Sequence, residues 1–307
     1  MAQRNPLQQV SDFDLRLLRL YITVVECGGF TAAEGVLGIT RSAISQHMND
    51  LEKRLGMRLC QRGRAGFALT AEGREVLQAA QKALAAIEIF RADVNQLHQQ
   101  LRGDLNIGII NNLVTLPRMR ITRALKLLRD HSAGVRINLG MTTPAEIERG
   151  VLDGRLHAGA IPAIASLSGL DYLPLYQENS FLYCSREHRL FSLPDMDISD
   201  NLLAGEDAIV PTYRLPAAAI TLYQRLHGAA SASDREGIAF LILSGSFIGY
   251  LPDHYARQWE AKGMLRPLCP ERLQFATPLA LITRAARGNN LILDRFLEAL
   301  GKEEAGI

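Results

Sequence analysis

The sequence predicts a multidomain chain with an all-α N-terminal domain that ends in a small hairpin, a long linker helix, and a C-terminal α/β domain of two lobes. Three amphipathic segments crowd the first seventy residues, a proline-free stretch then carries apolar residues three and four apart, and strand-like runs alternate with helical ones after Gly103. The expected domains are 1–70, 71–101 and 102–307. Within the last, lobe I spans 102–162 and 269–307, and lobe II spans 163–268.

The composition, with 48% hydrophobic and 21% charged residues over 307 positions, is that of a globular protein. The N-terminal "MAQRNPLQQV" lacks the apolar core of a signal peptide, and the longest apolar tract, 239–251, is too short to span a bilayer. We therefore expect a cytoplasmic protein without a membrane span. The four cysteines form no C-x-x-C pair, which argues against a metal site and favours isolated reduced thiols over a redox pair of Cys184 and Cys269.

The first helix is expected from Asp14 to Cys27, with Asp12 or Asp14 as its cap. Its predicted core-facing residues are Leu15, Leu18, Ile22 and Val25. A glycine pair ends it, and the spacing of Thr31 and Glu34 predicts a capping box for a second, short helix that ends near Leu37.

The third helix follows a turn at Gly38, with Thr40 as its cap. Its apolar stripe is Ile44, Met48, Leu51 and Leu55, and its polar leading face carries Arg41, Ser42, Ser45, Gln46 and Asn49. Two short helices around a glycine turn, the second with an exposed polar face, form a helix-turn-helix. We expect Arg41 and Gln46 to contact bases, and Thr31, Thr40 and Ser42 to contact the DNA backbone. The alternative is an ordinary solvated helix face.

Two short strands, 57–61 and 67–69, enclose a turn rich in glycine and arginine, which is typical of a wing. Arg62 and Arg64 at its tip are expected to touch phosphate or the minor groove. Residues 1–70 contain nine Lys/Arg and six Asp/Glu, a net +3, whereas the remainder carries 25 and 26, a net −1. This asymmetry is compatible with a nucleic-acid partner.

The segment "FTAAEGVLGITRSAISQHMNDLEKRLGMRLCQRGRAGFALTAEGREVL" resembles the winged helix-turn-helix of the LysR-type transcriptional regulators. It departs from the family pattern at Ser42, often proline, and at Gly35, usually a larger residue. The resemblance implies binding to double-stranded promoter DNA and a linker helix that pairs with its copy in a homodimer or homotetramer. It also implies a small organic effector held by a domain that resembles periplasmic solute-binding proteins. RNA polymerase is a further candidate partner, and no cofactor is implied.

The linker segment would be about 45 Å long as a helix, too long to be buried within one small domain. Its exposed apolar seam favours a second copy of the chain as partner, and packing against the same chain is the alternative.

After the linker, strands at 105–110, 135–140 and 157–161 alternate with helices at 117–129 and 144–152, which predicts a parallel sheet. A second run has strands at 171–176, 181–185, 208–211 and "SFIGYLP", with helices at 215–226 and "DREGIAFLILSG". A strand at 275–283 and a helix at 290–300 close the chain. The crossings between the lobes are expected at 162–167 and 266–270.

Ligands of open α/β sheets lie beyond the carboxyl ends of the strands. The candidate effector-binding residues at such places are Asn111, Asn112, Thr142, Thr143, Thr212, Gly245, Ser246 and Phe247. Thr142 or Thr143 as a plain helix cap, and the two asparagines as turn residues, are the alternatives.

No catalytic motif is present: neither H-E-x-x-H, nor a phosphate-binding loop, nor G-x-S-x-G. A transport solute-binding protein would need an export signal and would not use the first 101 residues, and a ligand-regulated enzyme would need a catalytic group of residues. The sequence therefore predicts a sequence-specific DNA-binding regulator of transcription that responds to an effector, and not an enzyme.

Overall fold

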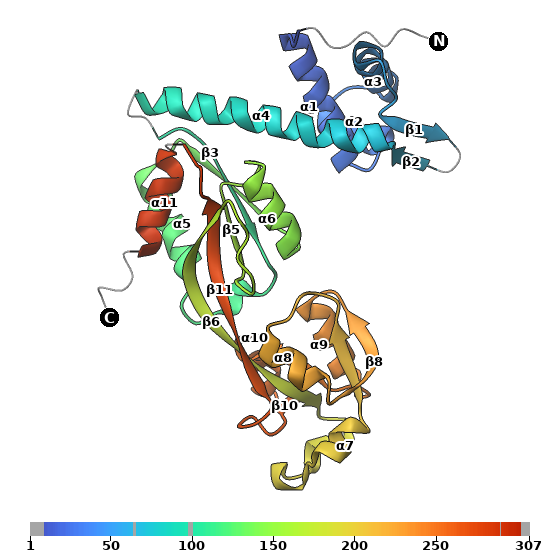
Figure 1. Cartoon of the computed structure of the whole chain (residues 1–307), viewed down its shortest axis with the longest axis vertical. Helices are drawn as coiled ribbons and strands as arrows, with labels where there is room; N and C mark the ends of the chain where they lie inside the picture. Colours follow the sequence, from blue (N-terminus) through green and yellow to red (C-terminus); the bar gives the residue numbers. More distant parts are fainter. Residues whose placement is uncertain (1–8, 64–65, 98–100, 289, 302–307) are drawn as a thin grey trace. The chain divides into compact units, whose positions relative to one another are not determined.

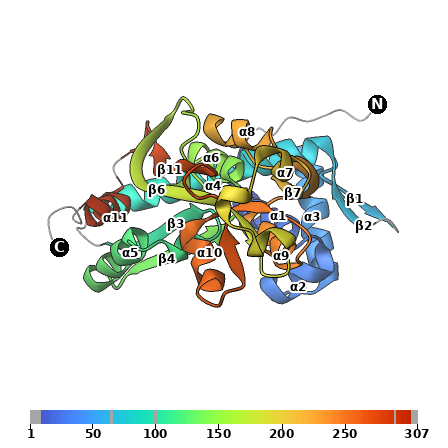
Figure 2. The same cartoon turned by 90° about the horizontal axis from the view of Figure 1, so that it is seen from below.

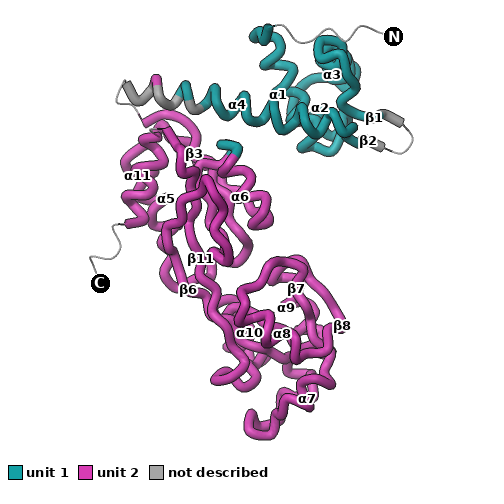
Figure 3. Tube along the Cα trace, viewed as in Figure 1, with its two compact units in different colours: residues 1–92, 153–155 teal, residues 93–152, 156–307 magenta. Residues whose placement is uncertain are grey.

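The computed structural model describes residues 9–63, 66–97, 101–288 and 290–301. The chain divides into two compact units, residues 1–92 with 153–155, and residues 93–152 with 156–307 (Figure 3). Each unit is described by itself.

The first unit begins with three helices, α1 (Asp12–Glu26), α2 (Phe30–Leu37) and α3 (Arg41–Leu55). Strands β1 (Cys60–Gly63) and β2 (Gly66–Leu69) form an antiparallel hairpin, and α4 (Ala71–Leu97) follows (Figure 1). The sequence places the turns, because Gly38 and Gly56, which end α2 and α3, both adopt φ 66. The three-helix core and the hairpin match the winged helix-turn-helix prediction.

The core-facing side of α1 differs from the prediction. Its buried residues are Asp14, Leu17, Leu20, Tyr21 and Val24, whereas the predicted set is only half-buried. The helix carries apolar residues on two adjoining faces, and the tertiary fit selects the one that includes Tyr21. For α3 the prediction was right, since Ile44, Met48 and Leu51 are buried and Leu55 packs against the same core.

Two predicted caps were wrong. Ser11, not Asp12 or Asp14, caps α1, and Asp14 completes a capping box by accepting hydrogen bonds from the Ser11 main-chain N–H and hydroxyl. Gly29 precedes α2 without a side-chain cap, so Thr31 is the second residue of that helix. Glu34 instead accepts a hydrogen bond from the main-chain N–H of Arg41 and so ties α2 to the start of α3.

Lobe I of the second unit has a sheet with parallel strands in the order β4-β3-β5: β3 (Gly103–Ile109), β4 (Val135–Met141) and β5 (Ala158–Pro162). Helices α5 (Arg120–His131) and α11 (Leu291–Gly301) pack together on one face, and α6 (Pro144–Leu152) lies on the other (Figures 1 and 2). A short 3-10 helix, η1 (Leu113–Thr115), follows β3. This is the predicted parallel arrangement.

Two long antiparallel strands, β6 (Leu170–Ser185) and β11 (Gln274–Arg284), run from one lobe into the other (Figure 1). Leu175 of β6 and Leu279 of β11 belong to the lobe I core, whereas Leu182 and Phe275 belong to the lobe II core. The crossings therefore lie between 175 and 182 and between 275 and 279, and not at the predicted 162–167 and 266–270. The two strands predicted at 171–176 and 181–185 are one.

Lobe II contains the parallel pair β7 (Asp207–Pro211) and β8 (His227–Ala232), while β9 (Gly249–Pro252) and β10 (Leu265–Pro267) pair with β6. Its helices are α7 (Asp200–Ala204), α8 (Ala217–Tyr223), α9 (Arg235–Leu243) and α10 (Asp253–Glu260), and its 3-10 helices are η2 (Arg189–Ser192) and η3 (Asp195–Asp197). Strand β8 and helix α10 were not predicted.

Within the described ranges, no single helix is long and apolar enough to cross a membrane. The pair α1 and α2 reaches that length and hydropathy only together, with a bend of 119° between them. Much of the pair's apolar surface is core, because Tyr21, Val24 and Ala33 are buried completely.

Candidate functional site

The exposed face of α3 gathers the polar residues that the sequence assigns to DNA. Arg41, Ser42 and Gln46 are exposed, Ser45 and Asn49 are half-buried, and Thr31 on α2 and the cap residue Thr40 are exposed. The Thr40 hydroxyl accepts the main-chain N–H of Ala43 at 3.4 Å and lies 3.1 Å from the Ser42 hydroxyl. The N-terminal turn of α3 thus presents hydroxyl, amide and guanidinium side chains at the positive end of the helix, which is suited to phosphates and base edges.

The C-terminal half of α3 is fixed to the hairpin by a buried carboxylate that sequence reasoning had not singled out. Glu52 is 6% exposed, and its Oε1 accepts the main-chain N–H groups of Leu59 at 2.9 Å and of Cys60 at 3.3 Å. The Arg58 guanidinium lies 3.4 Å from the other carboxylate oxygen. Because a buried carboxylate without such donors would be costly, this contact fixes how the hairpin leaves the helix.

A second carboxylate joins the end of α3 to the start of α1. Two guanidinium nitrogens of Arg54 donate to the two oxygens of buried Asp14, one of them at 2.7 Å. The hydrogen bond from Arg54 lowers the pKa of Asp14 to about 2, and the bonds from Ser11 act in the same direction. Two turns further along the buried face of α1, the Tyr21 hydroxyl donates to the Gly73 carbonyl of α4 at 2.7 Å.

The side chains of the two predicted wing residues lie outside the part of the chain that the structure describes. Arg62 lies on β1, but its side chain is outside the described part of the structure, and Arg64 lies outside the described residues altogether. Their assignment to DNA therefore stays a prediction from the sequence.

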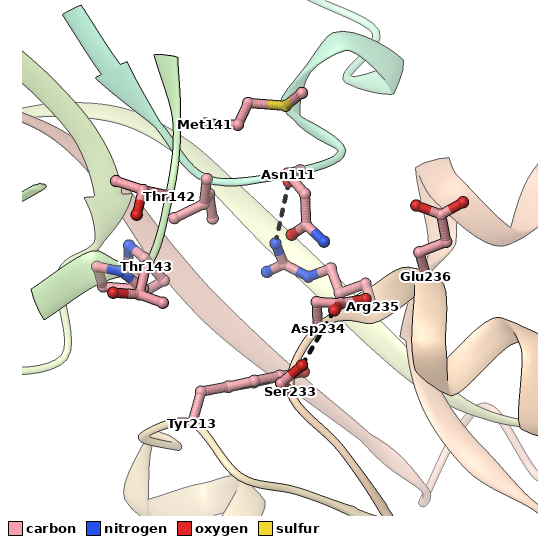
Figure 4. Close-up of a pocket in the computed structure, with 12 residues that line it drawn as sticks. Asn111, Met141, Thr142, Thr143, Tyr213, Ser233, Asp234, Arg235 and Glu236 are labelled. Carbon is pink, nitrogen blue, oxygen red and sulfur yellow. Dashed lines mark hydrogen bonds between the residues drawn. The ribbon is translucent and has the colours of Figure 1, made fainter. Parts of the chain in front are cut away.

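The second candidate site is a pocket of about 380 Å³ between the two lobes (Figure 4). This volume is in the range of small-ligand pockets, roughly 300–1,000 Å³. Lobe I contributes Ile110, Asn111, Met141, Thr142, Thr143, Pro144 and Pro162, and lobe II contributes Tyr213, Ser233, Asp234, Arg235 and Glu236. The side chains that Figure 4 labels offer hydroxyl, amide, carboxylate and guanidinium groups to one cavity.

Three of the predicted effector-binding residues line this pocket: Asn111, Thr142 and Thr143. Asn112 caps η1 with φ 68, and Thr212 lies beside Tyr213, its main-chain N–H bonded to Ala232. Gly245, Ser246 and Phe247 lie between α9 and β9 and do not line the pocket. The strand that they precede, β9, is antiparallel to β6, so the rule of carboxyl strand ends does not apply to them.

The charged pocket residues that sequence reasoning missed come from the end of β8 and the start of α9. β8 is parallel to β7, so Ser233, Asp234 and Arg235 follow a carboxyl strand end exactly as Thr212 and Tyr213 do. The signal was hidden because "HGAASA" has few residues of high strand propensity. Asp234 also caps α9, since its side chain accepts the Gly237 N–H at 2.8 Å.

The electrostatics of the pocket are set by groups behind its wall. Arg235 is 8% exposed and forms an ion pair with Glu178 of β6, which is 1% exposed. The charge of Arg235 is therefore balanced by a carboxylate that does not line the pocket itself. Burial raises the pKa of the Tyr213 hydroxyl, which therefore stays protonated as a hydrogen-bond donor at neutral pH. Among the described residues, no group of three or more His, Cys, Asp or Glu is arranged to hold a metal ion.

Comparison with known families gives two matches along the chain. Residues 15–74 match the bacterial regulatory helix-turn-helix protein of the lysR family, and residues 98–305 match the LysR substrate binding domain.

Relatives and solved structures agree with this. The HTH-type transcriptional activator BauR of Pseudomonas aeruginosa is 66% identical over 298 residues, which is 97% of this chain and 98% of BauR. The crystal structure of CbnR, a LysR family transcriptional regulator, shares the fold with a TM-score of 0.66 at 19% identity, over 94% of this chain and 98% of CbnR. The structure of full-length CbnR complexed with its target DNA gives 0.65 at 21% identity, over 94% and 99%. The chain belongs to the LysR family of transcriptional regulators.

Proposed function

We propose that the chain is a transcriptional activator that binds promoter DNA through α3 and the wing and responds to a small organic effector in the pocket between its lobes. The observation that carries the DNA-binding part is the exposed polar face of α3 on a helix anchored at both ends, by Glu34 at its start and by Glu52 and Arg54 at its end. Activation, rather than repression, is inferred from the similarity to BauR.

Arg41 and Gln46 read base edges, because both are exposed on the first two turns of α3, where helices enter the major groove. Thr31, Thr40, Ser42, Ser45 and Asn49 contact the backbone or flank the reading residues, and Arg62 and Arg64 extend the contact to neighbouring phosphates. Backbone contacts set the position on the duplex, whereas the base contacts set the sequence.

The effector binds among Asn111, Thr142, Thr143 and the start of α9. The N-terminal ends of two helices lie at this pocket: that of α6 favours an electron-rich ligand group, whereas the Asp234 carboxylate already occupies that of α9. Because β6 and β11 join the lobes, a ligand that contacts both lobes favours one angle between them. Asn112, Thr212 and residues 245–247 act through the segments next to the pocket.

The active form is a homodimer paired through α4, or a homotetramer made of two such dimers. Phe90 and Val94 on this helix are exposed by 69% and 37%, an apolar surface that a second copy would cover. The working division is a DNA-binding domain 1–70, a linker helix 71–101 and an effector-binding domain 102–307. The protein acts in the cytoplasm, where its promoter and RNA polymerase are, and carries out no catalysis.

The test is binding of the full-length protein to promoter fragments from its own genomic neighbourhood, titrated with random-sequence competitor. Gln46→Ala should weaken specific binding by about 1–3 kcal/mol and leave random-sequence binding nearly unchanged. Gln224→Ala, an exposed glutamine at the end of α8, is the matched control and should change neither. Equal losses on specific and random DNA for Gln46→Ala would show that α3 does not read bases.

A further inference from the structure

A buried, charged hydrogen-bond cluster lies directly behind the pocket. Its centre is Glu178, in the middle of β6, with Arg235 at the start of α9 and His254 in the first turn of α10. These three residues are 1%, 8% and 6% exposed. One oxygen of Glu178 accepts from Arg235, and the other lies 3.1 Å from Nε2 of His254.

The cluster reaches lobe I at two points, both in the loop that follows β3. Arg235 Nη1 donates to the main-chain oxygen of Asn111 at 3.4 Å, the contact drawn in Figure 4. On the other side, His254 Nδ1 lies 2.7 Å from the Thr115 hydroxyl. Since Asn111 and Arg235 face each other across the pocket, the cluster ties its two walls together.

The Thr115 hydroxyl has one proton and two acceptors within reach. Its oxygen is 2.9 Å from the main-chain oxygen of Asn112 and 2.7 Å from the His254 ring. If the proton goes to Asn112, the ring nitrogen Nδ1 is the donor to the Thr115 oxygen. If the proton goes to the ring, the Asn112 carbonyl loses the hydroxyl and keeps the bond from the Thr115 main-chain N–H at 3.2 Å.

The second arrangement matters because Asn112 holds an uncommon backbone conformation. Its φ of 68 lies in the left-handed region, which residues other than glycine adopt rarely. The residue before it, Asn111, is the one that enters the pocket. The shape of this loop therefore depends on the hydrogen bonds of a ring that belongs to lobe II.

We propose that Glu178 and His254 are positioning residues of the effector pocket, which hold Arg235 and the Asn111–Thr115 loop in place and transmit changes at either wall to the other lobe. The proposal rests on the effector-binding role of the pocket proposed above. An effector that contacts Arg235 or Asn111 and displaces either residue then also displaces the Glu178 carboxylate. Glu178 belongs to β6, the strand that crosses between the lobes. This gives ligand binding a physical route to the angle between them.

The test compares Thr115→Val, which keeps the shape but removes the hydroxyl, with Thr115→Ser, which keeps it. Amide hydrogen exchange is followed by mass spectrometry in the full-length protein, with no DNA and no added small molecule. Thr115→Val should speed exchange about tenfold or more both in residues 111–116 and, across the pocket, in the first turn of α9. Thr115→Ser should stay within about twofold of the unchanged protein in both segments.

His254→Gln is the second variant and should loosen the same two segments, so that the test stands if Thr115→Val fails to fold. Thr221→Val on α8 is the matched control, because its hydroxyl donates within its own helix, to the Ala217 carbonyl at 3.4 Å, and it should alter neither segment. Exchange that rises in the loop alone, or rises equally for Thr115→Ser, would overturn the proposal.

The outcome is independent of the proposed function, since no ligand is used. A protein that passes this test but binds no small molecule would refute the effector role of the pocket and leave the connection between its walls intact. If the protein binds an effector but the Thr115→Val and His254→Gln variants do not speed amide exchange in the first turn of α9, only the positioning role of Glu178 and His254 is refuted.

Discussion

Gly73 leaves the least room for a side chain among the described glycines of the first unit, because α4 begins there beside the residue that precedes the hairpin. A Cβ at this position would lie 2.0 Å from the main-chain oxygen of Leu59 and 2.9 Å from its carbonyl carbon. Ordinary van der Waals contact begins at 3.4 Å, so the start of α4 would have to move by about 1.4 Å. Neither neighbour is the flexible end of a side chain. We therefore expect Gly73→Ala to destabilise the first unit.

The magnitude follows from what such a movement would break. The Gly73 carbonyl accepts the Tyr21 hydroxyl at 2.7 Å, and its N–H donates to the Thr70 hydroxyl at 2.9 Å, so a shift of this size takes one or both bonds beyond hydrogen-bond length. Losing a buried hydrogen bond costs about 1–1.5 kcal/mol, and overpacking typically adds about 1–3 kcal/mol. The higher helix propensity of alanine offsets about 1 kcal/mol of this destabilisation. The net expected loss is about 1–3 kcal/mol.

The assay is urea-dependent amide hydrogen exchange of α1 and α3 in the full-length protein, which reports the free energy of opening of this unit. Gly35→Ala is the matched control, because a Cβ there meets nothing within 4 Å. As an exposed helical glycine, it should gain up to about 1 kcal/mol when replaced by alanine. If both substitutions stabilise the unit equally, the close approach at Gly73 is not a constraint and the reasoning fails.

Three further predictions concern the same unit. Arg62→Ala and Arg64→Ala should each weaken binding to specific and random DNA alike, and reduce the salt slope by about 0.9 if each contacts one phosphate; an unchanged slope would remove them from the interface. Because the pKa of Asp14 is lowered from 3.8 to about 2 in the folded state, its bond to Arg54 stabilises the unit above about pH 4. This stabilisation is lost as the pH falls through about 2, and in Asp14→Asn the acid part of a stability-against-pH curve should flatten. Glu52→Gln should cost about 1–3 kcal/mol, measured by urea unfolding, because the hairpin amides lose a charged acceptor.

Local sequence signals made helix α3 predictable. Gly38 and Gly56 adopt left-handed turns at its two ends, and Thr40 caps it. Its apolar residues lie on a single face, so only one side of the helix can face the core. The core face of α1 was not predictable in this way, because two apolar faces adjoin and only packing against α3 and α4 decides between them. Strand β8 was missed for the opposite reason, since its small residues carry almost no local preference and parallel pairing with β7 alone makes it a strand.

Strand β6 looked broken in the sequence for a reason that is itself informative. Pro174 and the polar run around Glu178 interrupt the apolar pattern, yet the strand continues, with an irregular register opposite Leu279 and Ala280. A charged residue in the middle of a crossing strand costs free energy unless it is paired, and here Glu178 is fully buried with two partners from different helices. An apolar residue would fit the strand pattern, but it would leave Arg235 buried without a counter-charge at the pocket wall. The polar run that interrupts the apolar pattern of β6 thus contains the carboxylate that holds Arg235 at the pocket wall, and this run is the sequence feature that marks the site.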